Sequence, residues 1–406
     1  MARIITDNKK IKEALERGVE KIYPTKNKLE GVLKSGKRIR LYCGYDPTAP
    51  SLHIGHAITL RKLSHFQKLG HEIIMLIGDF TAMIGDPTDK KAVRKKLSRQ
   101  DVQKNLKNYK KMASKIISFS GPNPAKAMYN SKWNDKLKFS ELIELASSFT
   151  VQQMITRDMF QERIKKEKPI YLHEFLYPLI QAYDSLKMNV DLEIGGSDQT
   201  FNMLCGRDLI KNIKGKEKFV LTTKLLEDPS GKKMGKTEGN MIKLDDNPKD
   251  MYGKVMAWPD FLIIPGLELC TGKKLEDIKK AEEKMNNKKA NPRDVKADLA
   301  WEIVKENYSK KEADKARKQF DQVFKEKNTP QEAPIYKVRK KSINILDLLL
   351  ETKLASSKSE AKRLINQGAV KIKGKIIKGW DEEIDLKKEK IIQVGKKNFR
   401  KIKSIS

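Results

Sequence analysis

The chain has 406 residues, of which 38% are hydrophobic and 7% aromatic, so it is long enough for two or three domains with buried cores. It has no run of about 18 apolar residues and no apolar signal core near its start, so we expect neither a membrane-spanning nor a secreted protein. Its three cysteines, Cys43, Cys205 and Cys270, lack metal-ligand spacing, and an odd number fits a reducing compartment. We therefore expect a cytoplasmic protein.

The net charge of +32 arises from 85 Lys and Arg against 53 Asp and Glu. Such a charge favours a polyanionic partner, because Lys and Arg neutralise phosphates and release counterions. However, 70 of the 85 basic residues are Lys, and they are spread along the whole chain, as in a Lys-rich proteome. The total charge therefore leaves both explanations open.

The first third of the chain predicts the start of an α/β domain. Residues 1–35 have apolar side chains near helical spacing and predict an amphipathic helix. Residues 37–51 predict a strand that enters a loop, and residues 56–70 predict a helix that ends at a glycine. The apolar run 71–80 is typical of a buried parallel strand. Strand, loop, helix and strand in this order indicate a βαβ unit.

The middle of the chain continues the pattern. Residues 90–185 predict mostly helices. Residues 190–199 alternate apolar side chains and then reach two glycines, which predicts a strand, a loop and a helix to about residue 209. A further strand and a polar loop follow from residue 218. Residues 266–328 predict highly charged helices.

The C-terminal part forms a separate basic module. Residues 328–336 are polar, contain two prolines and predict a linker. Beyond them the pattern predicts a helix, a Ser-rich turn, a second helix and short strands. Residues 331–406 carry 20 Lys and Arg against 9 Asp and Glu, a net charge of +11. This excess favours binding to nucleic acid.

The stretch GKKMGKT (231–237) is one residue shorter than a P-loop. A P-loop also needs a buried strand before it and a helix after it, whereas Asp-Pro-Ser precedes this stretch and Glu-Gly-Asn follows it. A P-loop is therefore excluded. A loop with three lysines, two glycines and a threonine can still close on phosphates.

A second stretch, SLHIGH (51–56), lies where a loop becomes a helix. The imidazoles of His53 and His56 and the helix N-terminus can donate to phosphate oxygens, and Gly55 allows a ligand to approach the backbone. Two alternatives are a metal site and a pair of structural histidines. No Cys or carboxylate stands beside the pair to complete a metal-binding set.

Taken together, these motifs carry a family resemblance. The ordered segments that carry it are LYCGYDPTAPSLHIGH (41–56), GDFTAMIGDP (78–87), FLYPLIQAYD (175–184), IGGSDQ (194–199) and KKMGKT (232–237). The chain resembles class I aminoacyl-tRNA synthetases, and specifically the bacterial-type tyrosyl-tRNA synthetases, over nearly its whole length. Residues 53–56 match the HIGH motif of that class, and residues 233–237 match its KMSKS motif except at Gly235 and Thr237.

The resemblance implies a fold and a domain order. The fold class is α/β, with a Rossmann-type doubly wound parallel sheet that binds ATP at the carboxyl ends of its strands. The catalytic domain would span 1–265 with a helical insertion at about 90–185. An α-helical anticodon-binding domain would follow at 266–330, and a linker with a small α+β RNA-binding domain at 331–406.

The resemblance also implies a two-step reaction. Tyrosine attacks the α-phosphate of ATP to give tyrosyl-adenylate and pyrophosphate, and the tyrosyl group then passes to the 3′ end of tRNA(Tyr). The catalytic residues that match are Thr48, His53, His56, Lys233, Lys236 and Thr237. The ATP-binding residues that match are Gly44, Asp46, His53, Gly55, His56, Asp198 and Lys236. Mg²⁺ would accompany ATP without a dedicated protein metal site.

Recognition of tyrosine is carried over residue by residue. Tyr42 and Asp184 match the pair that binds the phenolic hydroxyl of the substrate. Asp86, Tyr177 and Gln181 match the contacts to its α-amino group. Gln199 matches a further tyrosine contact, and Asn130 a further pocket residue.

The C-terminal module resembles the RNA-binding domain first seen in ribosomal protein S-four. The residues expected to face phosphates are Lys358, Lys362, Arg363, Lys371 and Lys373. The alternative is a solvated basic face in a Lys-rich chain. The implied partners are tRNA(Tyr), L-tyrosine and ATP. The resemblance also implies a homodimer that binds neither DNA nor membranes.

Three other functions remain as alternatives. A tryptophan-specific synthetase shares the fold, although Tyr42 paired with Asp184 argues against it. A nucleotidyltransferase shares a HIGH-like motif but does not need the tyrosine-pocket residues. A catalytically idle RNA-binding or splicing cofactor is expected to lose His53, Gly55 or Lys236, and all three are present.

Overall fold

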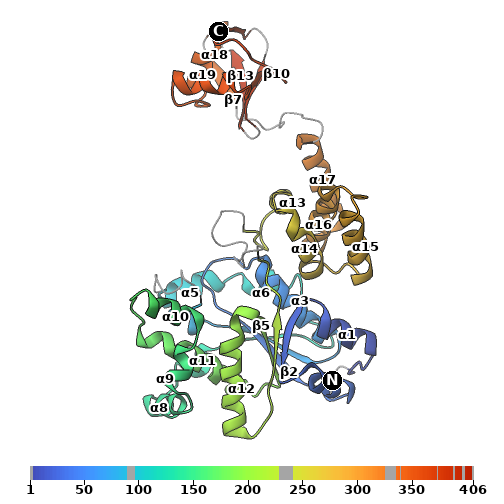
Figure 1. Cartoon of the computed structure of the whole chain (residues 1–406), viewed down its shortest axis with the longest axis vertical. Helices are drawn as coiled ribbons and strands as arrows, with labels where there is room; N and C mark the ends of the chain where they lie inside the picture. Colours follow the sequence, from blue (N-terminus) through green and yellow to red (C-terminus); the bar gives the residue numbers. More distant parts are fainter. Residues whose placement is uncertain are drawn as a thin grey trace. The chain divides into compact units, whose positions relative to one another are not determined.

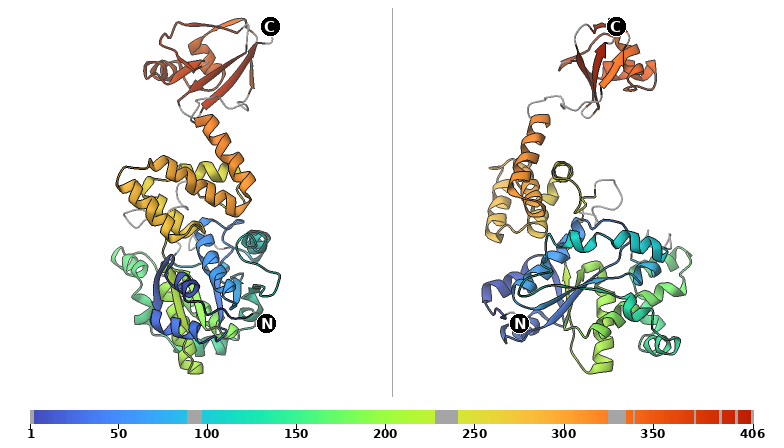
Figure 2. Two further views of the ribbon diagram at one scale, coloured as in Figure 1. Left: turned by 90° about the vertical axis from the view of Figure 1, so that its right-hand side faces the viewer. Right: turned by 180° about the vertical axis from the view of Figure 1, so that it is seen from behind.

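The structure, a computed structural model, describes residues 3–88, 97–227, 241–324, 335–338, 340–372, 374–386, 389–395 and 398–404. The chain divides into two compact units, Met1–Ala316 and Arg317–Ser406 (Figures 1 and 2). Within the described part of the chain, no helix combines the length and the hydrophobicity that crossing a bilayer requires.

A six-stranded sheet forms the centre of the first unit. Its spatial order is β1 (Val19–Tyr23), β6 (Phe219–Thr223), β5 (Leu192–Gly196), β2 (Arg40–Tyr45), β3 (Glu72–Ile77) and β4 (Lys126–Tyr129). Neighbouring strands pair in parallel, except that β1 pairs antiparallel with β6. The chain runs from β2 outward to β3 and from β5 outward to β6, in opposite directions. The predicted doubly wound sheet is confirmed, and its switch point lies between β2 and β5.

Two strands depart from the sequence prediction. Residues 1–35 form α1 (Asn8–Glu16), β1 and α2 (Lys26–Lys34) instead of one helix. The chain turns out of α1 at Gly18, because this residue adopts a φ of +61°, which glycine allows. A side chain there would also place its Cβ 2.6 Å from Leu269. β1 then obtains its hydrogen bonds from β6, about 200 residues away, which a local pattern cannot reveal. β4 lies within the segment predicted to be mostly helical; its four residues are too short for a clear period.

Helices cover both faces of the sheet. Figure 1 shows α1 and α3 (Ile54–Lys68) on one side, and α11 (Leu172–Met188) and α12 (Thr200–Lys214) on the other. The predicted helix after β2 and its stop at Gly70, with a φ of +93°, are confirmed. Side chains of β2 alternate between the two faces, so that Tyr42 packs against Met188 and Ile210 on the α11 side, whereas Tyr45 meets Thr59 of α3.

The helical insertion and the helices after the sheet complete the unit. The short helix α4 (Thr81–Ile84) follows β3, and the predicted insertion contains α5 (Arg99–Leu106), α6 (Tyr109–Ala113), α7 (Ser131–Asn134), α8 (Phe139–Ser147), α9 (Val151–Ile155) and α10 (Asp158–Lys165). Beyond the sheet lie α13 (Pro248–Met256), α14 (Ile263–Cys270), α15 (Leu275–Asn286) and α16 (Pro292–Asn307), followed by α17 (Lys310–Phe324), within which the first unit ends at Ala316. The predicted charged helices of this region are confirmed.

The second unit has the predicted order of elements. Its helices are α18 (Ile345–Glu351) and α19 (Lys358–Asn366), and Ser357 in the turn between them caps α19 by accepting a hydrogen bond from the Glu360 backbone N–H. One sheet contains β10 (Lys375–Ile376), β9 (Val370–Ile372), β12 (Lys390–Val394), β13 (Asn398–Ser404) and β7 (Ile335–Val338). A second pairs β11 (Glu383–Asp385) with β8 (Ser342–Asn344). Buried aliphatic side chains of both helices and the strands form its own core.

Candidate active site

The predicted site residues of the first unit gather at the carboxyl ends of the parallel strands. Gly44 and Asp46 lie at the end of β2, Asp86 in the segment after β3, Asn130 after β4 and Asp198 after β5. These ends meet along one edge of the sheet, beside the switch point, where doubly wound sheets bind ligands. Gly44 is exposed, and a Cβ built on it meets open space. The missing side chain therefore leaves the end of β2 uncovered.

The two histidines of SLHIGH form one rigid unit at the start of α3. His53 is the N-cap residue, and its Nδ1 accepts the backbone N–H of Gly55 at 3.1 Å. The backbone N–H of His53 donates in turn to Nδ1 of His56, also at 3.1 Å. The two rings stack with centroids 3.7 Å apart. Because both Nδ1 atoms accept, each neutral ring carries its proton on Nε2 and can donate from that atom.

Gly55 leaves room for this arrangement. A Cβ at Gly55 would lie 3.0 Å from two atoms of the His53 ring. Thr48, predicted beside the histidines, lies in the turn after β2, where its backbone N–H donates to the Asp46 carbonyl at 2.8 Å.

The segment 241–245 pairs with the histidine motif. Ile54 N–H donates to the Ile242 carbonyl at 2.9 Å, and Leu244 N–H donates to the Leu52 carbonyl at 2.8 Å. Ser51 adds a side-chain bond to Asp245 at 2.7 Å. These contacts attach the chain directly after residue 240 to the start of α3. The predicted residues Lys233, Lys236 and Thr237 lie outside the described residues.

Asp184 is buried at the predicted phenolic end of the tyrosine pocket, with 2% of its surface exposed. Its Oδ1 accepts from Trp133 Nε1 at 2.7 Å and from Asn134 Nδ2 at 3.0 Å, and its Oδ2 accepts from Asn130 Nδ2 at 3.0 Å. Each carboxylate oxygen has two lone pairs, so Oδ2 retains one acceptor position. Burial raises the pKa of Asp184 to about 7, although the three donors lower it.

Tyr42, the predicted partner of Asp184, is also buried. Its hydroxyl lies 2.8 Å from Oγ of Ser185, the residue after Asp184 on α11. Burial raises the pKa of Tyr42 well above its usual value, and the negative charges of Glu193 and Asp184 raise it further. The Tyr42 phenol therefore stays protonated at neutral pH.

The remaining predicted tyrosine contacts form hydrogen-bonded pairs. Gln199 Nε2 donates to Asp86 Oδ2 at 2.6 Å, and the Tyr177 hydroxyl donates to Asp46 Oδ2 at 2.9 Å. Gln181 Nε2 donates to Glu193 Oε1 at 2.9 Å. Residues predicted to contact tyrosine and ATP are thus brought into direct contact through Tyr177 and Asp46.

Thr81, which sequence reasoning missed, joins these groups into one network. Its hydroxyl donates to Asp46 Oδ1 at 2.7 Å and lies 3.1 Å from Asn130 Nδ2, which also bonds to Asp184. The network therefore runs from Asp184 to Tyr177. A Cβ at Gly78 would lie 1.9 Å from Asp46 Oδ1, so glycine is needed there for the contact. Thr81 lies within the segment GDFTAMIGDP, which was the available signal.

Other polar residues around the pocket were also missed. They include Trp133, Asn134, Ser185, Glu193 and Lys218. The described residues contain no group of three His, Cys, Asp or Glu side chains arranged to hold a metal ion.

In the second unit, the predicted RNA-binding residues lie on α19 and β9. Lys358, Lys362 and Arg363 are exposed on α19, and Lys371 is partly buried on β9. Lys362 Nζ lies 4.2 Å from the centre of the Trp380 ring, which is 51% exposed. Lys373 lies outside the described residues.

Two family models together match most of the chain. Residues 34–325 match "tRNA synthetases class I (W and Y)", and residues 324–402 match "Tyrosine–tRNA ligase SYY-like C-terminal domain". Tyrosine–tRNA ligase 2 of Clostridium acetobutylicum is 43% identical over 392 residues, which cover 96% of this chain and 97% of the relative. The tyrosine–tRNA ligase of Thermotoga maritima is 42% identical over 389 residues, covering 96% of each chain.

Solved structures agree with the fold. A C-terminally truncated mitochondrial tyrosyl-tRNA synthetase of Coccidioides posadasii is 26% identical, with a TM-score of 0.62 over 76% of this chain and 91% of that chain. The tyrosyl-tRNA synthetase of Archaeoglobus fulgidus, solved with L-tyrosine, is 20% identical, with a TM-score of 0.59 over 76% of this chain and 99% of that chain. At this identity the second likeness concerns the fold alone.

Proposed function

We propose roles for the site residues from one premise: the chain belongs to the tyrosine–tRNA ligases, which are class I aminoacyl-tRNA synthetases. Such an enzyme activates tyrosine with ATP and transfers it to tRNA. In the first step, a carboxylate oxygen of tyrosine bonds to the α-phosphorus of ATP, and the bond from that phosphorus to pyrophosphate breaks.

Asp184 is the residue that selects tyrosine. The observation that carries this assignment is the single acceptor position left on its buried Oδ2. A phenolic O–H fills that position, whereas phenylalanine leaves a buried carboxylate oxygen without its donor. Such an unpaired group costs about 1–3 kcal/mol, and more when it is charged. Tyr42 lies beside it, and Asn130 holds the carboxylate in place.

The opposite end of the pocket receives the α-ammonium group. Asp86 supplies the negative charge, and Tyr177, Gln181 and Gln199 supply direction. An ammonium group only donates hydrogen bonds, so it requires acceptors there.

ATP binds across the uncovered end of β2 and the start of α3. Gly44 leaves room for the nucleotide, and Asp46 and Asp198 lie at the strand ends on either side of the switch point. His53 and His56 donate from Nε2 to phosphate oxygens, Gly55 lies between them in the motif, and Thr48 is a further contact to the phosphates. Charge moves onto pyrophosphate in the transition state, so these contacts act on rate more than on ATP affinity.

Lys233, Lys236 and Thr237 act on the same phosphates, and the segment 241–245, which follows them in the sequence, pairs with the start of α3. Mg²⁺ arrives on the phosphates of ATP, because hard divalent ions in such sites bind mainly to substrate oxygens and water.

tRNA(Tyr) binds to the helical region 266–330 and to the basic face of the second unit. Lys358, Lys362 and Arg363 are exposed on one short helix, with Lys371 and Lys373 nearby in sequence, and they contact phosphates. We expect a cytoplasmic enzyme that binds neither DNA nor membranes.

The enzyme acts as a homodimer through its helical insertion. Large apolar side chains that are exposed in the single chain concentrate there: Phe139, Ile143, Val151, Ile164, Tyr171 and Leu172. An exposed apolar surface of this kind marks an interface. Replacing Leu172, which is 84% exposed, by Asp should convert a dimer to a monomer in analytical ultracentrifugation.

The pocket assignment is tested by replacing Asp184 with Ala. ATP–pyrophosphate exchange in the wild type should depend on L-tyrosine, and better exchange with tryptophan would refute the specificity. In Asp184→Ala, discrimination against phenylalanine should fall about 100-fold, because the group that requires a phenolic donor is gone. The KM for ATP should stay near normal. Asp208→Ala, an exposed carboxylate on α12, is the matched control.

A further inference from the structure

A buried ion pair lies behind the tyrosine pocket. Lys218, the residue before β6, contacts Glu193 of β5, and the two side chains are 0% and 2% exposed. Gly206 on α12 makes room for the lysine, because a Cβ there would lie 2.5 Å from Lys218 Nζ. Apolar side chains of the same volume usually serve stability as well as a buried ion pair does. A role in positioning other groups therefore deserves a test.

All three donors of the Lys218 ammonium are used. Nζ donates to Glu193 Oε2, to Ser185 Oγ at 2.9 Å and to the Met203 carbonyl at 3.2 Å. Ser185 thereby has one of its two lone pairs occupied. Its own hydroxyl proton points to Glu193 Oε2 at 3.2 Å.

This arrangement bears on the direction of the Tyr42 hydroxyl. We assign the only Ser185 proton to its bond with Glu193, which makes Tyr42 the donor in the 2.8 Å contact between Tyr42 and Ser185, where the geometry of that contact alone allows either direction. The Tyr42 oxygen is then left with lone pairs. Asp184 Oδ2 also keeps an acceptor position, so the phenolic end of the pocket presents two acceptors to a ligand.

The other oxygen of Glu193 fixes Gln181. Gln181 Nε2 donates to Glu193 Oε1 at 2.9 Å. The opposite orientation of the amide would place its oxygen against a carboxylate oxygen, and neither atom could donate. Glu193 therefore leaves the amide oxygen, an acceptor, as the group that Gln181 offers to an ammonium.

We propose that Glu193, with Lys218 as its counter-ion, is a positioning residue that makes both ends of the tyrosine pocket hydrogen-bond acceptors. It acts through Ser185 on Tyr42 at the phenolic end and directly on Gln181 at the amino end. A ligand with a donor at each end, as tyrosine has, fits this pattern. The proposal rests on the pocket assignment given above.

The direction of the hydrogen bonds is tested with amino acids that differ at the 4-position of the ring. L-4-aminophenylalanine carries two N–H donors there, tyrosine carries one O–H, and 4-methoxyphenylalanine carries only an acceptor. ATP–pyrophosphate exchange of the wild type should accept the amino analogue at least 10-fold better, by kcat/KM, than the methoxy analogue. Equal use of the two analogues would overturn the assignment of acceptors.

Variants then test the relay. Ser185→Ala removes the link to Tyr42 without leaving a buried charge unpaired, and should reduce the preference for tyrosine over phenylalanine about 10-fold. Glu193→Gln should reduce it similarly and also raise the KM for tyrosine more than Ser185→Ala does, because Gln181 is released as well. The KM for ATP should change less than 2-fold in both variants. A purely structural role would instead lower kcat without a selective change in the KM for tyrosine.

Two further variants keep the test decisive. Glu217→Gln changes an acid to an amide in the ion pair with Arg207, 2.8 Å apart and outside the relay, and should leave every parameter unchanged. Gly206→Ala removes no charge but places a Cβ against both Lys218 Nζ and Ser185 Oγ, and should therefore raise the KM for tyrosine. It replaces Glu193→Gln in the test if that variant does not fold. Tyrosine-dependent exchange that is unaffected by Ser185→Ala and Gly206→Ala would overturn the relay alone. Absence of tyrosine-dependent exchange in the wild type would overturn the pocket assignment itself.

Discussion

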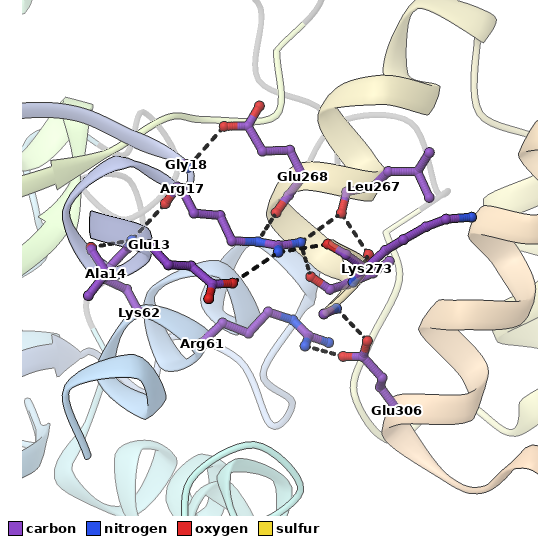
Figure 3. Close-up of polar contacts among 12 residues, drawn as sticks. Glu13, Ala14, Arg17, Gly18, Arg61, Lys62, Leu267, Glu268, Lys273 and Glu306 are labelled. Carbon is purple, nitrogen blue, oxygen red and sulfur yellow. Dashed lines mark hydrogen bonds and ion pairs between the residues drawn. The ribbon is translucent and has the colours of Figure 1, made fainter. Parts of the chain in front are cut away.

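Two buried basic side chains of the first unit have different partners. Lys218, behind the pocket, meets the carboxylate of Glu193. Arg17, at the end of α1, meets mainly backbone carbonyls near the end of α14 (Figure 3). Its guanidinium donates to the carbonyls of Glu268 at 3.0 Å, Lys273 at 2.8 Å, Thr271 at 2.6 Å and Leu267 at 3.3 Å. Within one unit, buried basic groups therefore bind either a carboxylate or a set of backbone carbonyls.

At the junction of α1, α3 and α14, the basic side chains cap the carboxyl ends of helices. The last carbonyls of a helix have no partner within it and carry partial negative charge, so a guanidinium satisfies them well. Lys62 of α3 does the same for α1, donating to the carbonyls of Ala14 at 2.7 Å and Arg17 at 2.6 Å. Arg61 adds an ion pair with Glu306 of α16 (Figure 3). Lys218, in contrast, contacts the side chains of Glu193 and Ser185, which we propose to orient Tyr42 and Gln181. We therefore expect Arg17 to control stability and the Lys218–Glu193 pair to control substrate choice.

The largest expected effect is that of Arg17→Met on stability. Removing the guanidinium leaves several buried carbonyls without donors, which should lower the free energy of unfolding by about 3–5 kcal/mol. Urea denaturation followed by circular dichroism measures this change. Arg207→Met, which breaks the more exposed pair with Glu217, should cost about 1 kcal/mol or less. The contrast between junction and pocket breaks down if Arg17→Met is as stable as the control but discriminates poorly against phenylalanine.

The next effect concerns pH and Asp184. Its pKa of about 7 means that below pH 7 the free enzyme carries a proton on this carboxyl, which then competes with the phenolic donor of tyrosine. The kcat/KM for tyrosine at saturating ATP should therefore rise with pH, by up to about 10-fold per pH unit, and level off above pH 7. Asp184→Asn should remove this dependence. A wild-type profile that matches the variant would contradict the assignment.

Stability should respond to the same titration with the opposite sign. The folded state holds the Asp184 proton up to about pH 7, whereas the unfolded chain releases it near 3.8. Between these values the folded state binds more protons, so this group's contribution to the free energy of unfolding falls as pH rises. The difference in stability between the wild type and Asp184→Asn should show that slope.

The sequence predicted the site residues at the strand ends better than the buried side chains that support them. Glycines, histidines and carboxylates at strand ends are visible as motifs, because the positions at which parallel strands end are set by local patterns. Glu193 was not recognised, because it alternates with Leu192 and Ile194 and so suggests a solvated face, yet it is 2% exposed. Its partner Lys218 received no role, since it was only the first residue of a predicted strand. Whether such a charge is buried depends on contacts between distant segments, which no local period records.

β1 illustrates the same limit in the fold. Its residues continue the apolar spacing of α1, and only pairing with β6 makes them a strand. Local preference is weak where a long-range partner supplies the hydrogen bonds.

A third region extends the contrast, because the cations of α19 are left exposed. Lys358 forms an ion pair with Asp347 at 3.1 Å and Arg363 one with Glu360 at 3.8 Å, and such exposed pairs contribute little stability. Lys362→Ala and Arg363→Ala should therefore each leave stability and tyrosine-dependent exchange unchanged. Each should weaken tRNA binding a few-fold and reduce the slope of log K against log salt concentration by about 1, as expected for one lost phosphate contact.

The control for this last effect is Lys37→Ala, which removes an equally exposed charge from the first unit. Filter binding of tRNA(Tyr) over a range of salt concentrations distinguishes the two explanations of the net charge of +32. If Lys37→Ala weakens binding as much as Lys362→Ala, the charge acts diffusely and α19 is not a dedicated RNA surface. If only the α19 variants change the slope, the exposed cations of this helix bind phosphates directly. The buried cations of the first unit, in contrast, form hydrogen bonds and ion pairs within the protein.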